Sequence, residues 1–182
     1  MKLHEIDWRH NSISKVLDTL SDELTNVANE INPDEPESGL ELTNSLMGIA
    51  FVTAQVYIAG TVSDAKKLLE PFTVTKANLL KDFSKQIPGS EITEIELCDA
   101  LANYFKHHDE WSSDWSFTNQ NKVTIGVLRS VGLDHHDSYP CILAADILFF
   151  DTLSPPSHYL SALLSMIVEW RRKVMNGLDS YR

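Results

Sequence analysis

Apolar side chains recur every three or four residues along most of this chain, which is the spacing of one buried face of an α-helix. The pattern predicts four helices in the first part of the chain: Ser12 to Ile31, Leu40 to about Pro71, Thr75 to Ile87 and Thr93 to Trp111. It predicts three more that begin near Val123, Pro140 and Ser157, the last ending near Leu178. No long linker divides the pattern. We therefore predict an all-α fold, a bundle of about six to eight helices in a single domain over residues 1–182.

Glycine and proline residues mark where the predicted helices end. The stretch NPDEPESG after the first helix holds two prolines and a glycine, so the backbone leaves the helix there. Gly132 suits the left-handed cap that ends a helix, and Pro140 suits a first helical turn. Ser154-Pro155-Pro156 is expected to introduce the last helix. Gly60 either breaks the second helix or marks a point of close packing.

The central helix begins with a strong local signal. Thr93 and Glu96 form a capping box, in which each side chain accepts a hydrogen bond from the other residue's free backbone N–H. Leu97, Leu101, Tyr104 and Trp111 then form the face expected to be buried. The opposite face carries Glu96, Asp99, Asn103, Lys106, His107 and Glu110. This face is either a functional surface or an ordinary solvated one.

Charge narrows the choice of partner. The chain has 26 Asp and Glu against 15 Lys and Arg, a net charge of −11. Such a charge repels nucleic acid and attracts basic proteins, although it also promotes solubility. Between Glu91 and Asp114 there are seven acids and one base, so the excess gathers around the central helix. A direct nucleic-acid partner is therefore not predicted.

Composition also bears on location and cofactors. The apolar share of 43% excludes a disordered chain, and no segment has the roughly 18 uninterrupted apolar residues of a membrane span. The N-terminus carries acids and a Trp where a secretory signal has a continuous apolar region, so we expect a cytoplasmic protein. Cys98 and Cys141 lie in apolar helical patterns and are expected to be free and buried. Without a glycine-rich phosphate loop or cysteines at zinc spacing, no cofactor is predicted.

Asn103 and His107 lie one helical turn apart, so an amide and an imidazole can contact one phosphate or carbonyl group. Here the sequence resembles the HEPN superfamily of helical proteins, whose ribonucleases pair an Arg with a His four to six residues later. Asn103 matches the polar residue that commonly follows this arginine and His107 matches the histidine, but Ala102 stands at the arginine position. The resemblance implies a ribonuclease or an inactive relative. Without the guanidinium, transition-state charge on phosphate loses its usual stabiliser, for which Lys106 is only a point-charge substitute.

A wider segment, ALANYFKHHDEW with the polar loop after it and NKVTIGVLRSVGL, is similar to small helical immunity proteins of bacterial contact-dependent growth inhibition systems. This resemblance covers about Ala100 to Leu133. It implies a cytoplasmic inhibitor that binds one cognate toxin domain, often a nuclease, and neutralises it without catalysis. An acidic surface suits a basic toxin, because complementary charge accelerates association. The candidate toxin-binding residues are Glu96, Asp99, Asn103, Lys106, His107, Glu110, Asp114 and Trp115.

Three other groups each have two interpretations. His-His-Asp occurs at 107–109 and at 135–137, and helical metal-dependent phosphohydrolases use a His-Asp dyad. However, neighbouring helical residues point about 100° apart, so no metal ligands are predicted. The basic run at 171–173 is an anion site or, preferably, compensates the dipole of the last helix. Trp115 and Phe117 are aromatic anchors of a polar loop. Trp115 either contacts a partner or, preferably, packs back on the bundle.

The leading hypothesis is therefore an acidic, cytoplasmic immunity protein that binds a cognate basic toxin domain. A HEPN-like ribonuclease or its inactive relative, using Asn103 and His107, is the first alternative, and a metal-dependent phosphohydrolase is the second. The sequence leaves homodimerisation open.

Overall fold

The structure is a computed structural model of the chain, and it describes residues 6–70, 73–150 and 158–181. The regular structure of these residues is helical, which confirms the predicted all-α bundle. The α-helices are α1 (His10–Glu30), α2 (Pro36–Leu69), α3 (Lys76–Asp82), α4 (Glu94–His107), α5 (Lys122–Ser130), α6 (Pro140–Phe149) and α7 (His158–Gly177). Two short 3-10 helices, η2 (His108–Glu110) and η3 (Leu178–Tyr181), follow α4 and α7.

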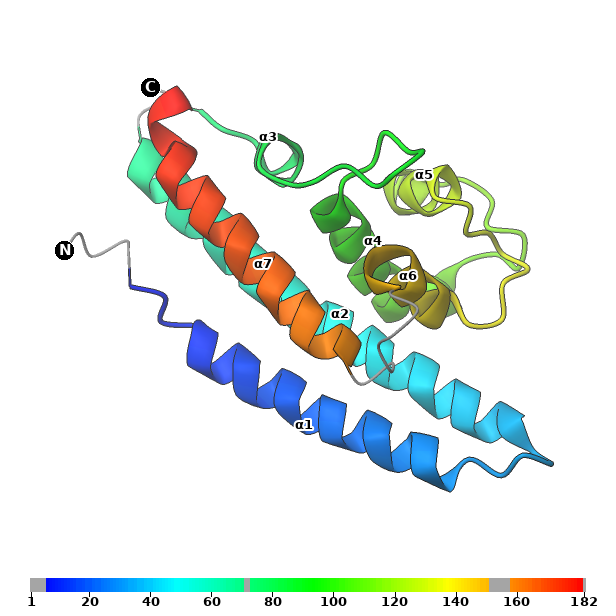
Figure 1. The fold of residues 1–182 in the computed structure, drawn as a ribbon. Coiled ribbons are helices and arrows are strands. Elements are labelled where there is room, and N and C mark those ends of the chain that lie inside the picture. The colour runs from blue at the N-terminus through cyan, green and yellow to red at the C-terminus, as the bar shows by residue number, and fades with distance from the viewer. Residues whose placement is uncertain (1–5, 71–72, 151–157, 182) are drawn as a thin grey trace.

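The 34-residue helix α2 is the centre of the bundle, and α1, α4, α6 and α7 all pack against it. Figure 1 shows α1 and α7 running alongside α2, with α4, α5 and α6 grouped on another side. Because α2 has neighbours on several sides, its buried residues include Phe51, Tyr57 and Ile58 on more than one face of the helix. This burial accounts for much of its apolar sequence, although Leu42, Ile49 and Val56 remain exposed.

By length and hydropathy α2 is also able to cross a membrane, the one such helix in the described part of the chain. However, 56% of its most apolar window is buried against the rest of the fold. Core helices of soluble proteins pass the same test, so this helix is weak evidence for a membrane span.

Two glycines of α2 allow other elements to approach closely. A Cβ atom on Gly48 would lie 2.0 Å from the ring of Phe105 in α4, and one on Gly60 would lie 2.4 Å from the Arg9 side chain. Gly60 therefore does not break α2. It marks a point of close packing, which is the other role that the sequence allowed.

Most helix ends agree with the sequence signals. The Thr93–Glu96 capping box is present, Gly132 has a φ of 88° after α5, and Pro140 is the first residue of α6. Two predicted helices are too long: α3 ends at Asp82, and α4 ends at His107, after which η2 tightens the chain. The predicted signals at Pro71, at Ser154 to Pro156 and at Ser157 lie outside the described residues.

The basic run at the end of α7 differs from the prediction. Arg171 is buried, with only 6% of its surface exposed, and its guanidinium lies 3.0 Å from Asp64 of α2 and 3.6 Å from Asp7. Its role is an internal ion network and not dipole compensation at the surface. Arg172 and Lys173 are exposed and pair with Glu169 one turn earlier.

Arg9 and Tyr57 complete this network. Arg9 donates to Asp64 at 2.7 Å, and the hydroxyl of Tyr57 bonds to Asp7. Partial burial of Asp64 raises its pKa, but hydrogen bonds from Arg9 and Arg171 outweigh that effect, so the pKa lies below its ordinary 3.8. The network thus ties the N-terminal segment to α2 and α7 through charges that satisfy one another.

Candidate functional site

The polar face of α4 is partly covered by neighbouring helices. Gln55 of α2 donates through its side-chain amide to Asp99 Oδ1 at 2.8 Å and to Asn103 Oδ1 at 3.0 Å. Its carbonyl Oε1 accepts a hydrogen bond from Lys106 Nζ at 2.7 Å. One amide side chain therefore links three of the residues predicted to bind a toxin.

Two of the predicted contact residues have roles inside the fold. Asp99 forms an ion pair with Lys76 at 2.6 Å, and its side chain is only 13% exposed. Glu96 accepts hydrogen bonds from the backbone N–H and the hydroxyl of Thr93, both at 2.9 Å. Since both carboxylates already have partners, they add little to an outward-facing binding surface.

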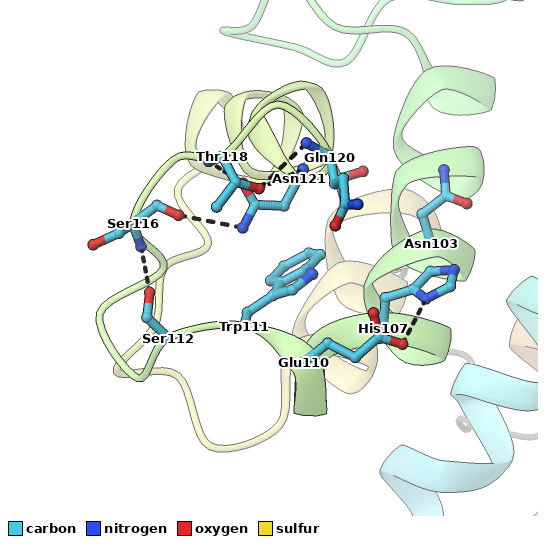
Figure 2. A pocket seen from close by; sticks show the side chains of 10 residues that line it. Asn103, His107, Glu110, Trp111, Ser112, Ser116, Thr118, Gln120 and Asn121 are labelled. Atoms are coloured by element: carbon cyan, nitrogen blue, oxygen red, sulfur yellow. Dashed lines mark hydrogen bonds and ion pairs between the residues drawn. The ribbon is translucent and has the colours of Figure 1, made fainter.

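Further along α4 the face opens into a cavity of about 670 Å³ between the end of this helix and the loop before α5. The lining side chains are mostly amides and hydroxyls together with one carboxylate, one imidazole and one indole: Asn103, His107, Glu110, Trp111, Ser112, Ser116, Thr118, Gln120, Asn121 and Thr124. Figure 2 shows Trp111 between His107 and the loop residues Ser116 to Asn121. The structure thus brings three predicted residues, Asn103, His107 and Glu110, to one pocket.

His107 and Glu110 form the charged edge of this pocket. Nδ1 of His107 lies 3.2 Å from Oε1 of Glu110, and their side chains are 51% and 69% exposed. His108 points elsewhere: its ring stacks on Tyr104 with ring centroids 4.8 Å apart, and its Nε2 lies 3.2 Å from Asp109. The first His-His-Asp run therefore divides between two sites and does not converge on one ion, as its helical spacing predicts.

The opposite wall is a loop organised by short polar side chains. Asn121 is buried, accepts a hydrogen bond from the Thr118 backbone N–H at 2.7 Å and donates to the Ser116 carbonyl at 3.2 Å. Asp114 accepts from Ser116 Oγ at 2.7 Å, and hydrogen bonds from Ser116 and Ser112 hold the pKa of Asp114 at about 2. These bonds give the wall a defined shape without a ligand.

An aromatic cluster supports the pocket from beneath. The ring of Trp115 lies 5.3 Å from Tyr104 and 5.9 Å from Trp111, measured between centroids. Trp115 is only 6% exposed, so its ring packs back on the bundle and is not an exposed anchor of the loop. Its φ of 50° is unusual for a bulky residue, and the buried ring holds the backbone there. Phe117, the other anchor, is 60% exposed beneath the Arg129 guanidinium, which lies 5.1 Å from the ring centroid.

The charge of the pocket determines which ligands it suits. Among the described residues that line it, Glu110 is the one side chain with a permanent charge, and none is Lys or Arg. Lys106 donates to Gln55 and does not line the pocket, and Ala102 is fully buried. A carboxylate, hydroxyl oxygens and an indole ring suit a cation better than a phosphate.

The second His-His run lies in the loop after α5, as predicted. One ligand atom from each of Asp134, His135 and His136 lies within 4.8 Å of the others. However, Arg129 donates to the Asp134 carboxylate at 3.0 Å, and Asp137 caps the turn by accepting from the Asp134 backbone N–H at 2.7 Å. A guanidinium already occupies the carboxylate that a metal ion would need.

Sequence reasoning did not identify the loop residues of the pocket or Trp111 as site residues. Trp111 follows the apolar stripe of α4 and was assigned to the core, although it is only half-buried. The available signal was the run of hydroxyl and amide side chains in SSDWSFTNQN, which is also the ordinary composition of a turn.

Compared with known proteins, the chain matches no family model, no curated protein and no solved structure.

Proposed function

We propose that this protein is a cytoplasmic binding protein of the immunity type, which neutralises a cognate basic toxin domain without catalysis. The proposal places the contact surface at the pocket between α4 and the loop before α5. A basic side chain of the partner enters the pocket and pairs with Glu110. The observation that carries this proposal is the absence of Lys and Arg from the described lining of a polar pocket that holds a carboxylate.

Three features support a cationic protein partner. Trp111 and Glu110 line the same pocket (Figure 2), and an indole ring together with a carboxylate suits an arginine or lysine side chain. Asp109 and Asp114 are exposed near the same segment and extend the negative surface. The net charge of −11 steers basic proteins toward the molecule and repels nucleic acid. Asn103 and His107 contribute further hydrogen-bonding groups to this surface.

The ribonuclease alternative is less well supported by the same geometry. Asn103 and His107 do share the pocket, as that reading requires. A phosphoryl-transfer site, however, needs positive charge to stabilise the transition state. With Lys106 bound to Gln55, the described lining supplies none beyond a protonated His107.

The test is capture of the partner from the bacterium that carries the gene, with tagged wild type and two variants. Glu110→Lys reverses the charge in the pocket, and Glu30→Lys makes the same change on the exposed end of α1. We expect one basic protein that wild type and Glu30→Lys retain and Glu110→Lys loses. The purified partner should then lose its enzymatic activity when one equivalent of wild-type protein is added.

Two results would contradict the proposal. If both variants retain the partner equally, the pocket is not the contact surface. If RNA is cleaved by wild type and this cleavage is lost in His107→Ala, the protein is a ribonuclease and not an inhibitor.

A further inference from the structure

One face of α2 carries an apolar stripe that the described part of the chain leaves uncovered. Leu42, Ile49 and Val56 are 45%, 41% and 60% exposed, and Val52, which is partly buried against the core, lies between them. We refer to these four residues as the α2 seam. Successive members of Leu42, Ile49 and Val56 are seven residues apart, which keeps them on one side of the helix. The rest of α2 packs against α1, α4, α6 and α7.

A seven-residue apolar period indicates a helix as the partner, because two helices that pack along their length meet at this spacing. The described helices of this chain leave the stripe unpaired. A helix of a second molecule is therefore the occupant that the spacing suits.

Charges at the two ends of α2 identify which helix fits. Glu37 and Glu41 lie at its N-terminal end, and Lys66 and Lys67 lie at its C-terminal end. All four are exposed, and none belongs to an ion pair among the described residues. A second copy of α2 in antiparallel orientation brings the acidic end of each helix to the basic end of the other.

We propose that the α2 seam is a self-association surface, which binds a second copy of this chain with the two α2 helices antiparallel. A two-fold axis near Val52 places Ile49 of one copy against Val56 of the other, and Glu37 toward Lys67. Such an interface is self-complementary, as a two-fold dimer requires. The pocket lies on α4 and α5, so this inference does not depend on the proposed function.

The first experiment measures association by sedimentation equilibrium over a wide range of protein concentration at low salt. Wild type should show a concentration-dependent dimer, which weakens when salt screens the charged ends. Val56→Glu should weaken dimerisation by about tenfold or more, since it places a charge at the centre of the interface. Val123→Glu on α5, where the wild-type side chain is 71% exposed, is the matched control and should leave the dimer unchanged. A wild type that stays monomeric throughout overturns the proposal.

The second experiment tests the antiparallel orientation by exchanging charge. One variant carries Glu37→Lys and Glu41→Lys, and the other carries Lys66→Glu and Lys67→Glu. Each should be monomeric by itself because like charges meet at both ends of the interface. Mixed in equal amounts, the two variants should form a heterodimer, because every end then faces its opposite charge. The antiparallel orientation would be excluded if each variant dimerised by itself, or if the mixture showed no association.

Discussion

The ion network around Asp64 and the pocket around Glu110 both gather polar side chains, but they are assembled in different ways. The network joins residues from the N-terminal segment, α2 and α7, which are far apart in the sequence. The pocket is built from one continuous stretch, Asn103 to Thr124. The first cluster connects elements of the fold, whereas the second surrounds a space.

The two clusters also differ in how far their carboxylates are hydrogen-bonded within the fold. Oδ2 of Asp64 accepts hydrogen bonds from both Arg9 and Arg171, so the charge of this carboxylate is compensated within the fold. Glu110 has one partner in the described structure, His107, and most of its surface faces solvent. A charge whose partners are all internal stabilises the fold, while a charge at an open pocket remains available to another molecule.

The largest change in the free energy of unfolding is expected at Trp115, where the pocket meets the core. Trp115→Ala should destabilise the protein by about 3–5 kcal/mol, because it removes a buried aromatic ring and leaves a cavity beneath Trp111 and Tyr104. Urea unfolding followed by circular dichroism measures this loss. It would show that the pocket rests on structural residues although its lining is free to bind.

Phe117→Ala is the matched control, since it lies two residues further along the same loop. The ring is 60% exposed and contacts Arg129, so its removal should cost only about 0.5–1 kcal/mol. Equal losses in the two variants would mean that the loop does not divide into a buried and an exposed part.

The next largest effect concerns the network. Asp64→Asn keeps the shape of the side chain but removes the negative charge between Arg9 and Arg171. Because Arg171 is buried, we expect a loss of about 2 kcal/mol at neutral pH, somewhat less than for a fully buried ion pair because Asp64 is partly exposed. The free energy of unfolding from urea titrations gives the value.

The same variant should be less sensitive to acid. The pKa of Asp64 in the folded protein lies below its ordinary 3.8, so the ionised carboxylate stabilises the fold. This contribution is complete above about pH 5 and is lost as the pH falls through the unfolded and then the folded pKa. The difference in stability between wild type and Asp64→Asn should therefore shrink below about pH 4. A difference that stays constant from neutral pH into this range would mean that charge is not the cause.

Local features of the fold could be predicted from the sequence because their causes are local. The Thr93–Glu96 capping box, the left-handed Gly132 and the first-turn Pro140 each depend on residues a few positions apart. Helical periodicity likewise predicts the order of the seven α-helices in the described residues. Contacts between distant segments could not be obtained in this way. Nothing near Arg171 in the sequence indicates that its guanidinium pairs with Asp64 and Asp7 inside the bundle.

The candidate site shows the same limit. Asn103, His107 and Glu110 were recognisable because helical spacing places them on one face of α4. That Gln55 of α2 would cover part of this face, and that Lys76 would neutralise Asp99, depends on how three helices pack. Trp115 was ambiguous because the polar residues around it in the sequence do not show whether its ring turns toward solvent or toward the bundle. Exposure, and therefore availability to a partner, is a property of the folded chain.

The smallest change in stability is expected at Glu110, and it completes the comparison with Asp64. Glu110→Gln removes the same charge as Asp64→Asn, but the side chain is 69% exposed and bonds only to His107 in the described structure. An exposed pair of this kind contributes little, so the free energy of unfolding should change by less than about 0.5 kcal/mol. Urea titrations of the two variants side by side make the measurement. A loss at Glu110 as large as that at Asp64 would place this carboxylate among the groups that hold the fold together, whereas a neutral result leaves its charge free for a ligand.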